Sequence, residues 1–151
     1  MSQTTISQYS AAAFAGMLDG VGPKNIRSYA AEEAIPIAYP VRLGTKKDKQ
    51  VLKATTGALT VGFAIHDHAR EQNGAGLVQF PIGDAVNVLT QGRFWINTTD
   101  AVVAGATANL TTATGFLTDE AVAAGIEAFT QMSVKFITAT TGPGLALVEV
   151  K

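Results

Sequence analysis

The stretch from Gly83 to Asn97, which reads GDAVNVLTQGRFWIN, constrains the fold more than any other part of the chain. Apolar and polar residues alternate on both sides of Thr90-Gln91-Gly92, which is typical of two half-buried strands joined by a turn. A three-residue loop closed by Gly92 in the left-handed region brings the apolar residues to one face, whereas a two-residue loop scatters them over both. We therefore predict a β-hairpin at the centre of an antiparallel β-domain. Its buried face would hold Val86, Val88, Phe94 and Ile96, and its outer face Asn87, Leu89, Arg93 and Trp95.

Other segments also alternate with the period of a strand. Pro40 would stand at an edge or at a strand start, and residues 45–49 form a polar turn. The segment 145–150 is apolar on both sides, which predicts a central or covered strand. Residues 23–35 show no clear period and are expected to form an extended connector, and residues 119–125 are at most weakly helical. The expected strands are 37–43, 51–52, 59–65, 106–111, 115–118, 129–138 and 145–150.

These segments add up to about seven to nine short strands, with turn signals at roughly 8–12-residue intervals. The 18 threonines also favour β-structure over helix. A chain of 151 residues suits one domain. We predict an all-β protein with a single antiparallel β-sandwich or barrel over residues 23–151.

Residues 1–22 are rich in Ser, Thr, Ala and Gly, and carry Phe14, Met17 and Leu18 as isolated apolar points. A short helix over 11–18 would be closed quickly by glycine. We interpret this segment as an N-terminal arm. Two alternatives stay open: the arm lies across a neighbouring subunit, or it packs back on its own domain.

The composition narrows the function. Charged residues make up 15% of the chain and the net charge is −1, which argues against nucleic-acid binding through a basic field and suits a surface that contacts other subunits. The absence of cysteine excludes disulfides, thiolate zinc sites and cysteine nucleophiles. There is no apolar run long enough to span a membrane and no secretory signal pattern, so synthesis in the cytoplasm is expected.

The main basic cluster surrounds the polar turn at 45–49. One interpretation is a solvated hairpin tip that keeps a sheet edge soluble, and the alternative is docking on an acidic partner. The cluster consists of Arg42, Lys46, Lys47, Lys49 and Lys53.

The triplet His66-Asp67-His68 is the most suggestive chemical motif. On a strand both imidazoles would point the same way, but two ligands are too few for a metal, and Glu71 or Asp84 would have to complete the site. Hydrogen-bonded histidines at a strand end are the alternative. No serine stands in a Gly-x-Ser-x-Gly elbow and no glycine pair opens a helix after a strand, so neither a hydrolase nor a phosphate site is indicated. We expect no catalytic residues, no metal and no cofactor.

Several short patterns, taken in order, resemble the structural cement (capsid decoration) proteins of tailed bacteriophages, from about Pro23 to the C-terminus. They are residues 62–68, 83–88, 92–96, 136–139 and 144–150. The resemblance implies a non-enzymatic jelly-roll-like or barrel-like domain on the outer face of a phage head, made in the host cytoplasm. It would bind the major capsid protein and its own copies as a homodimer or homotrimer, bridge capsid subunits and strengthen the shell. Neither nucleic acid nor membrane is an expected partner.

Combining this resemblance with the residue patterns, we expect nine residues at capsid or subunit contacts. An alternative function is a carbohydrate-binding head-fibre or tail module that recognises the host surface, with Trp95 and Tyr29 or Tyr39 lining a groove. A small metal-dependent enzyme is a further alternative. The nine expected contact residues are Phe14, Met17, Leu18, Ile26, Tyr29, His66, His68, Arg93 and Trp95.

Overall fold

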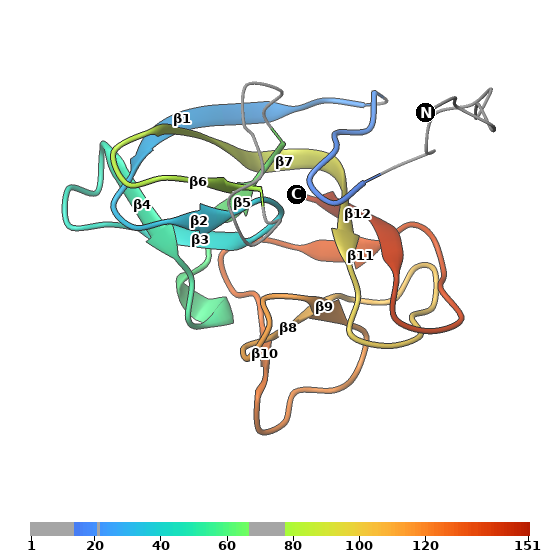
Figure 1. Cartoon of the computed structure of the whole chain (residues 1–151). Helices are drawn as coiled ribbons and strands as arrows, with labels where there is room; N and C mark the ends of the chain where they lie inside the picture. Colours follow the sequence, from blue (N-terminus) through green and yellow to red (C-terminus); the bar gives the residue numbers. More distant parts are fainter. Residues whose placement is uncertain (1–13, 21, 67–77) are drawn as a thin grey trace, which may run out of the picture.

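The computed structural model describes residues 14–20, 22–66 and 78–151, and within them the chain is built of β-strands with one short 3-10 turn (Figure 1). The prediction of an all-β sandwich or barrel is confirmed. The first elements are β1 (Asn25–Ala31), β2 (Ile35–Pro36), β3 (Pro40–Leu43), β4 (Gln50–Lys53), η1 (Gly57–Leu59), β5 (Gly62–Ala64) and β6 (Gln79–Phe80). They are followed by β7 (Ala85–Asn97), β8 (Asn109–Thr111), β9 (Leu117–Thr118), β10 (Ile126–Ala128), β11 (Val134–Phe136) and β12 (Leu145–Val150).

Five strands of the main sheet close into a small barrel. The order is β1-β4-β3-β5-β7, and β1 also pairs with β7, which completes the ring. All of these pairs are antiparallel except β1 with β4, which is parallel and therefore departs from the expected antiparallel arrangement. Small and medium aliphatic side chains fill the barrel, together with Phe80. Such a ring leaves no free edge where it is closed.

The predicted hairpin at residues 85–97 is wrong, because β7 is one continuous strand of 13 residues. Asn25 of β1 lies opposite Gln91 and the next residue, Ile26, lies opposite Leu89, so Thr90 is an extra residue on β7. This is a β-bulge, and Gly92 beside it has φ of +136°. A bulge and a three-residue turn both use a glycine in this part of the φ range, which is why the local sequence fits either.

The bulge changes which alternate side chains of β7 face each of the two cores. Val86 and Val88 face the barrel interior, whereas Phe94 and Ile96 belong to a second cluster outside it. All four are buried, as predicted, but they do not share one face. Leu89, expected on the outer face, is fully buried in the second cluster. Since the alternation shifts by one residue at the bulge, Leu89 before it and Phe94 and Ile96 after it all face the second layer.

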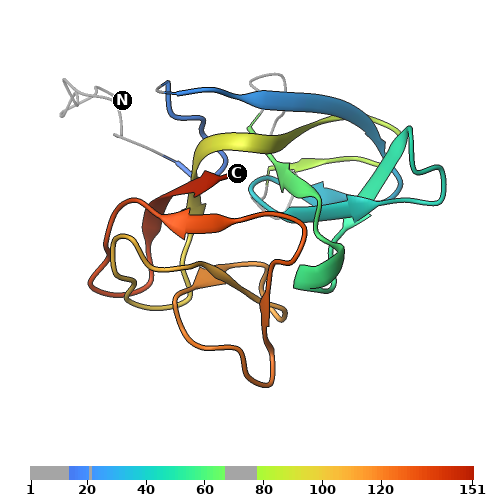
Figure 2. The same cartoon turned by 180° about the vertical axis from the view of Figure 1, so that it is seen from behind.

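The second layer lies beside the barrel (Figure 2). The second half of β7 pairs with β12, which pairs with β11, so the expected central position of the last strand is confirmed. The small sheet β10-β8-β9 lies next to these strands. This core combines aliphatic side chains with the rings of Phe63, Phe94 and Phe136, and the centroids of Phe63 and Phe94 are 4.8 Å apart.

Two other sequence predictions need correction. The segment expected to be a connector contains β1, a full strand, whose first four residues are exposed and therefore show no apolar period. Leu59, expected to begin the strand 59–65, lies instead in η1 and is 49% exposed. The N–H of Gly57 donates to a carboxylate oxygen of Glu127 at 2.8 Å, which holds this turn against β10 and delays the strand until Gly62. The β3–β4 hairpin is confirmed, with Pro40 at its start.

Candidate functional site

Residues 14–20 lie along the second half of β7. The N–H of Gly16 donates to the carbonyl of Trp95 (2.7 Å), the N–H of Trp95 donates to Met17 (2.9 Å), and Leu18 forms an antiparallel bridge with Phe94. The N–H of Asp19 donates to Arg93 (3.0 Å). Since β1 runs antiparallel to the first half of β7, residues 14–20 extend the same partner line along β7 past the bulge. For this part of the arm, packing on its own domain is the alternative that holds, and residues 1–13 lie outside the described part of the chain.

This contact brings together six of the nine residues predicted at an interface. The Phe14 and His66 rings meet edge to face with centroids 4.6 Å apart, and the N–H of His66 donates to the carbonyl of Gly16 at 2.9 Å. Leu18 packs against the second core, whereas Phe14 stays 40% exposed. We call this region, residues 14–20 with residues 92–97 and His66, the arm surface. The six residues are Phe14, Met17, Leu18, His66, Arg93 and Trp95.

The other three predicted residues lie elsewhere. Ile26 and Tyr29 are on β1, where Ile26 is exposed and Tyr29 packs against the barrel core. His68 lies outside the described residues. Trp95 is half-buried opposite Leu147, and Tyr39 packs against the barrel core and Gly115. Of the aromatic side chains that a carbohydrate groove would use, Tyr29 and Tyr39 thus pack against the barrel core, whereas Trp95 lies beside β12.

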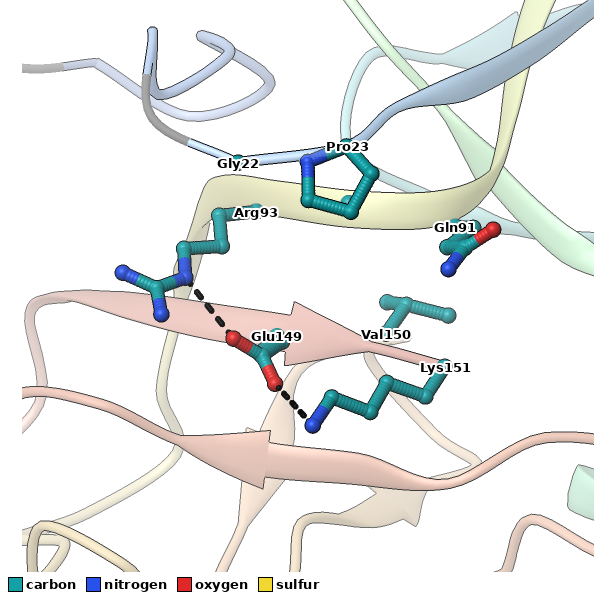
Figure 3. Close-up of a pocket in the computed structure, with 8 residues that line it drawn as sticks. Gly22, Pro23, Gln91, Arg93, Glu149, Val150 and Lys151 are labelled. Atoms are coloured by element: carbon teal, nitrogen blue, oxygen red, sulfur yellow. Dashed lines mark hydrogen bonds and ion pairs between the residues drawn. The ribbon is translucent and has the colours of Figure 1, made fainter.

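A chain of charges lies at one end of the arm surface, beside a cavity of about 230 Å³ (Figure 3). Arg93 Nε donates to Glu149 Oε2 at 2.8 Å, and Lys151 Nζ lies 3.0 Å from Glu149 Oε1. Hydrogen bonds from Lys151 and Arg93 lower the pKa of the Glu149 carboxyl below its ordinary value. Arg93 is thus paired with β12 of the same chain, and its contact with a capsid or neighbouring subunit stays a prediction.

The described residues form no metal centre: no three His, Asp or Glu side chains in this part of the chain stand close enough to hold an ion. Asp67, His68 and Glu71 fall in the range 67–77, which the structure does not describe, so neither the expected absence of a metal at the histidine triplet nor its alternative is tested there. No helix in the described ranges has the length and apolar character to cross a membrane.

The basic cluster forms the tip of the β3–β4 hairpin, where Lys46, Lys47 and Lys49 are exposed. The Lys53 ammonium lies 6.0 Å from the centre of the Tyr39 ring. Glu32 accepts hydrogen bonds from Thr45, which lower the pKa of its carboxyl, and Arg42 adds a smaller attraction. This arrangement is that of a solvated hairpin tip with acidic neighbours.

Two features of the surface were missed at the sequence level. A group of carboxylates gathers near Asp100 and Glu120, where hydrogen bonding and repulsion from Asp100 raise the pKa of the Glu120 carboxyl. Several large apolar side chains outside the arm surface and β1 are also exposed, although three of them fall in segments predicted as strands. They are Leu59, Ile82, Val103, Phe116, Val122 and Ile137.

Comparison with known proteins identifies the group to which this fold and surface belong. Residues 2–151 match the family described as "Structural cement protein (E217 gp24/Pam3 gp6)". A solved structure titled "The capsid of Myoviridae Phage XM1" contains a chain with the same fold, with a TM-score of 0.70 and 15% identity, covering 97% of this chain and 95% of the other. No curated protein matches the sequence. The family is one of phage structural proteins, which places such a chain in the virion. This chain therefore belongs to the phage structural cement protein family.

Proposed function

We propose that this protein is a cement protein that binds the outer surface of a tailed-phage head, bridges neighbouring major capsid subunits and stabilises the shell. The observation that carries the proposal is the family match over residues 2–151, nearly the whole chain. The protein would be made in the host cytoplasm and would act without catalysis, nucleic acid or membrane.

The architecture supports this role. The barrel and the second layer share β7, so a load applied to one layer passes through a hydrogen-bonded strand into the other. A domain with two cores on one strand resists deformation, because both cores must be disrupted before the strand can move. Such stiffness suits a protein that holds two capsid subunits at a fixed separation.

The exposed apolar side chains supply material for contacts. Ile82, Val103 and Val122 are each more than 60% exposed, and they lie in loops between the strands. Each contact can be weak, because a cement subunit that has bound one capsid subunit holds the second contact at a high effective concentration. We propose that the protein also contacts its own copies, and that residues 1–13 lie across a neighbouring subunit.

The test uses heads assembled without this protein. Adding the purified chain should decorate the outer surface at a fixed ratio to the major capsid protein and raise the temperature at which the heads release DNA. Electron microscopy locates the added density and a DNA-dye melting curve measures release. Density at one subunit only, or decorated heads that melt like bare ones, would contradict bridging and stabilisation.

Two truncations separate the arm from the domain. Deleting residues 2–13 removes the proposed reach to a neighbour and leaves the bonds of residues 14–20 with β7 intact, so the isolated domain should unfold at an unchanged temperature while head binding weakens. Deleting residues 2–20 also exposes the edge of β7 and should lower the unfolding temperature. If heads bind the shorter deletion as tightly as the full chain, residues 1–13 do not serve as a clamp.

A further inference from the structure

The first part of β1 has a free edge. One edge of β1 pairs with β7 from Asn25 to Ala30, but on the other edge β4 pairs only with Ala30 and Ala31. Residues 25–28 are all exposed. Figure 1 shows β1 running beyond the end of β4 along the outside of the barrel. A strand that extends past its neighbour in this way presents unpaired backbone groups.

The direction of these groups follows from the hydrogen bonds at the other end of β1. The N–H of Ala30 donates to Lys49 and that of Glu32 to Val51, whereas the N–H of Ala31 donates to Asp84. Because backbone groups alternate along a strand, the N–H and C=O of Ile26 and Ser28 point the same way as those of Ala30, away from β7. Neither N–H is therefore used in the pairing with β7, and the pairing with β4 reaches only Ala30 and Ala31.

We infer that this edge, Lys24 to Ser28, pairs antiparallel with the same edge of a second copy, so that β1 and its counterpart join two barrels into one continuous sheet. The contact is isologous and therefore makes a dimer rather than a trimer. The inference rests on the self-association in the proposed function and names its surface.

The charges select one register. If Arg27 stood opposite Arg27 of the partner subunit, two like charges would face each other at the short distance of a non-hydrogen-bonded pair. Moving the strands by one step places Ile26 on the twofold axis, Arg27 opposite Asn25 of the partner subunit, and Lys24 opposite Ser28 of the partner subunit. The two Ile26 residues then exchange both N–H···O bonds, and their side chains, each 41% exposed in the single chain, cover one another.

The chain is shaped to end the pairing on both sides. Beyond Ser28, the outer edge is occupied where Ala30 bonds to Lys49. Before Lys24, Pro23 has no N–H to donate, and Gly22 has φ of +90°, which turns the chain out of the strand. The unpaired edge is therefore limited to Lys24 to Ser28, and the same five residues of a second copy pair with it over its full length. Two other outcomes are possible. The edge could pair with a strand of a different protein, or the charges of Lys24 and Arg27 could keep it unpaired, and the test distinguishes both from self-pairing.

Single cysteines measure the register, because the natural chain contains none. Opposed residues of a hydrogen-bonded antiparallel pair have Cα atoms about 5.5 Å apart, within the range of a disulfide. Under mild oxidation Ile26→Cys should give a covalent dimer in several-fold higher yield than Arg27→Cys or Ser28→Cys. A higher yield from Arg27→Cys, or equal yields from all three, would overturn the inference, since the first means another register and the second means random collision.

A matched pair of lysine variants tests the free protein. Sedimentation should show the mass rising with concentration from 15.7 kDa toward twice that value for the natural chain and for Ile82→Lys, whose side chain is exposed on another turn. Ile26→Lys places two ammonium groups on the axis and should stay monomeric with an unchanged melting temperature. If Ile26→Lys dimerises like the natural chain, the β1 contact is excluded.

The cement function is tested separately on heads. If the Ile26→Lys variant still binds and stabilises heads, the cement function does not depend on the β1 contact. If the natural chain does not bind heads, the cement function is refuted.

Discussion

The two halves of β7 differ in how their edges are completed. The first half lies between β1 and β5 within a closed barrel, whereas the second half lies between β12 and residues 14–20, a segment with few strand hydrogen bonds of its own. Their cores differ as well: both are mainly aliphatic, but the barrel core holds one buried phenylalanine, Phe80, whereas the second core is larger and holds Phe63, Phe94 and Phe136. One strand can therefore serve a self-contained core and a core that depends on the N-terminal segment.

Removing one large side chain from each core should give the largest effects and test this contrast. Phe94→Ala empties a fully buried site in contact with Phe63 and should lower the free energy of unfolding by about 3–5 kcal/mol. Val88→Ala in the barrel should lower it by about 1.5–3 kcal/mol. Urea denaturation measures both. If Val88→Ala proves the more damaging, the second layer is not the main store of stability.

The bulge that divides β7 should respond to a single methyl group. Gly92→Ala forces a side chain into φ of +136° and should lower the free energy of unfolding by about 1–3 kcal/mol, because L residues avoid this region. The matched control is Gly142→Ala, where an added Cβ meets no atom within 4 Å and φ is ordinary, and it should change the midpoint little. Equal unfolding midpoints for the two variants would mean that the bulge can relax without the left-handed glycine.

The ion pairs of the second half of β7 make a smaller, pH-dependent contribution. The pKa of Glu149 lies below its ordinary value of 4.5, so its stabilising effect is complete above that value and disappears as the pH falls through the lowered pKa. Glu149→Gln should therefore melt below the natural chain at pH 7, and the two melting temperatures should converge in acid. A gap that persists at low pH would point to lost packing rather than lost charge.

The same substitution in the loop after β9 should act in the opposite direction and least of all. Hydrogen bonding and repulsion from Asp100 raise the pKa of Glu120, so the ionised carboxylate destabilises the fold and protonation relieves it. Glu120→Gln should raise the melting temperature slightly at pH 7, with the gain vanishing as the pH falls through the raised pKa. Melting curves across this range decide the matter, and a lower melting temperature at pH 7 would show that Glu120 makes a stabilising contact in its charged form.

The sequence alone singled out most residues of the arm surface, but not how they are arranged. Phe14, Met17 and Leu18 stood out as apolar points in a polar segment, and Arg93 and Trp95 as residues on the less buried face of a strand. Their meeting on one surface depends on backbone bonds such as Gly16 to Trp95, which leave no trace in side-chain pattern. The free edge of β1 left no signal either, because a strand exposed at its first four residues has no apolar period.

By itself, the sequence determined the all-β class, the burial of Val86, Val88, Phe94 and Ile96, the β3–β4 hairpin and the central last strand, because alternation and turn chemistry are local. Tertiary structure decided whether Thr90 to Gly92 became a turn or a bulge. Both use the same glycine conformation, and the choice depends on the strands that pair with β7. Those partners, β1 and residues 14–20, come from a part of the chain more than 50 residues away in sequence, so only the folded molecule brings them to the strand they complete.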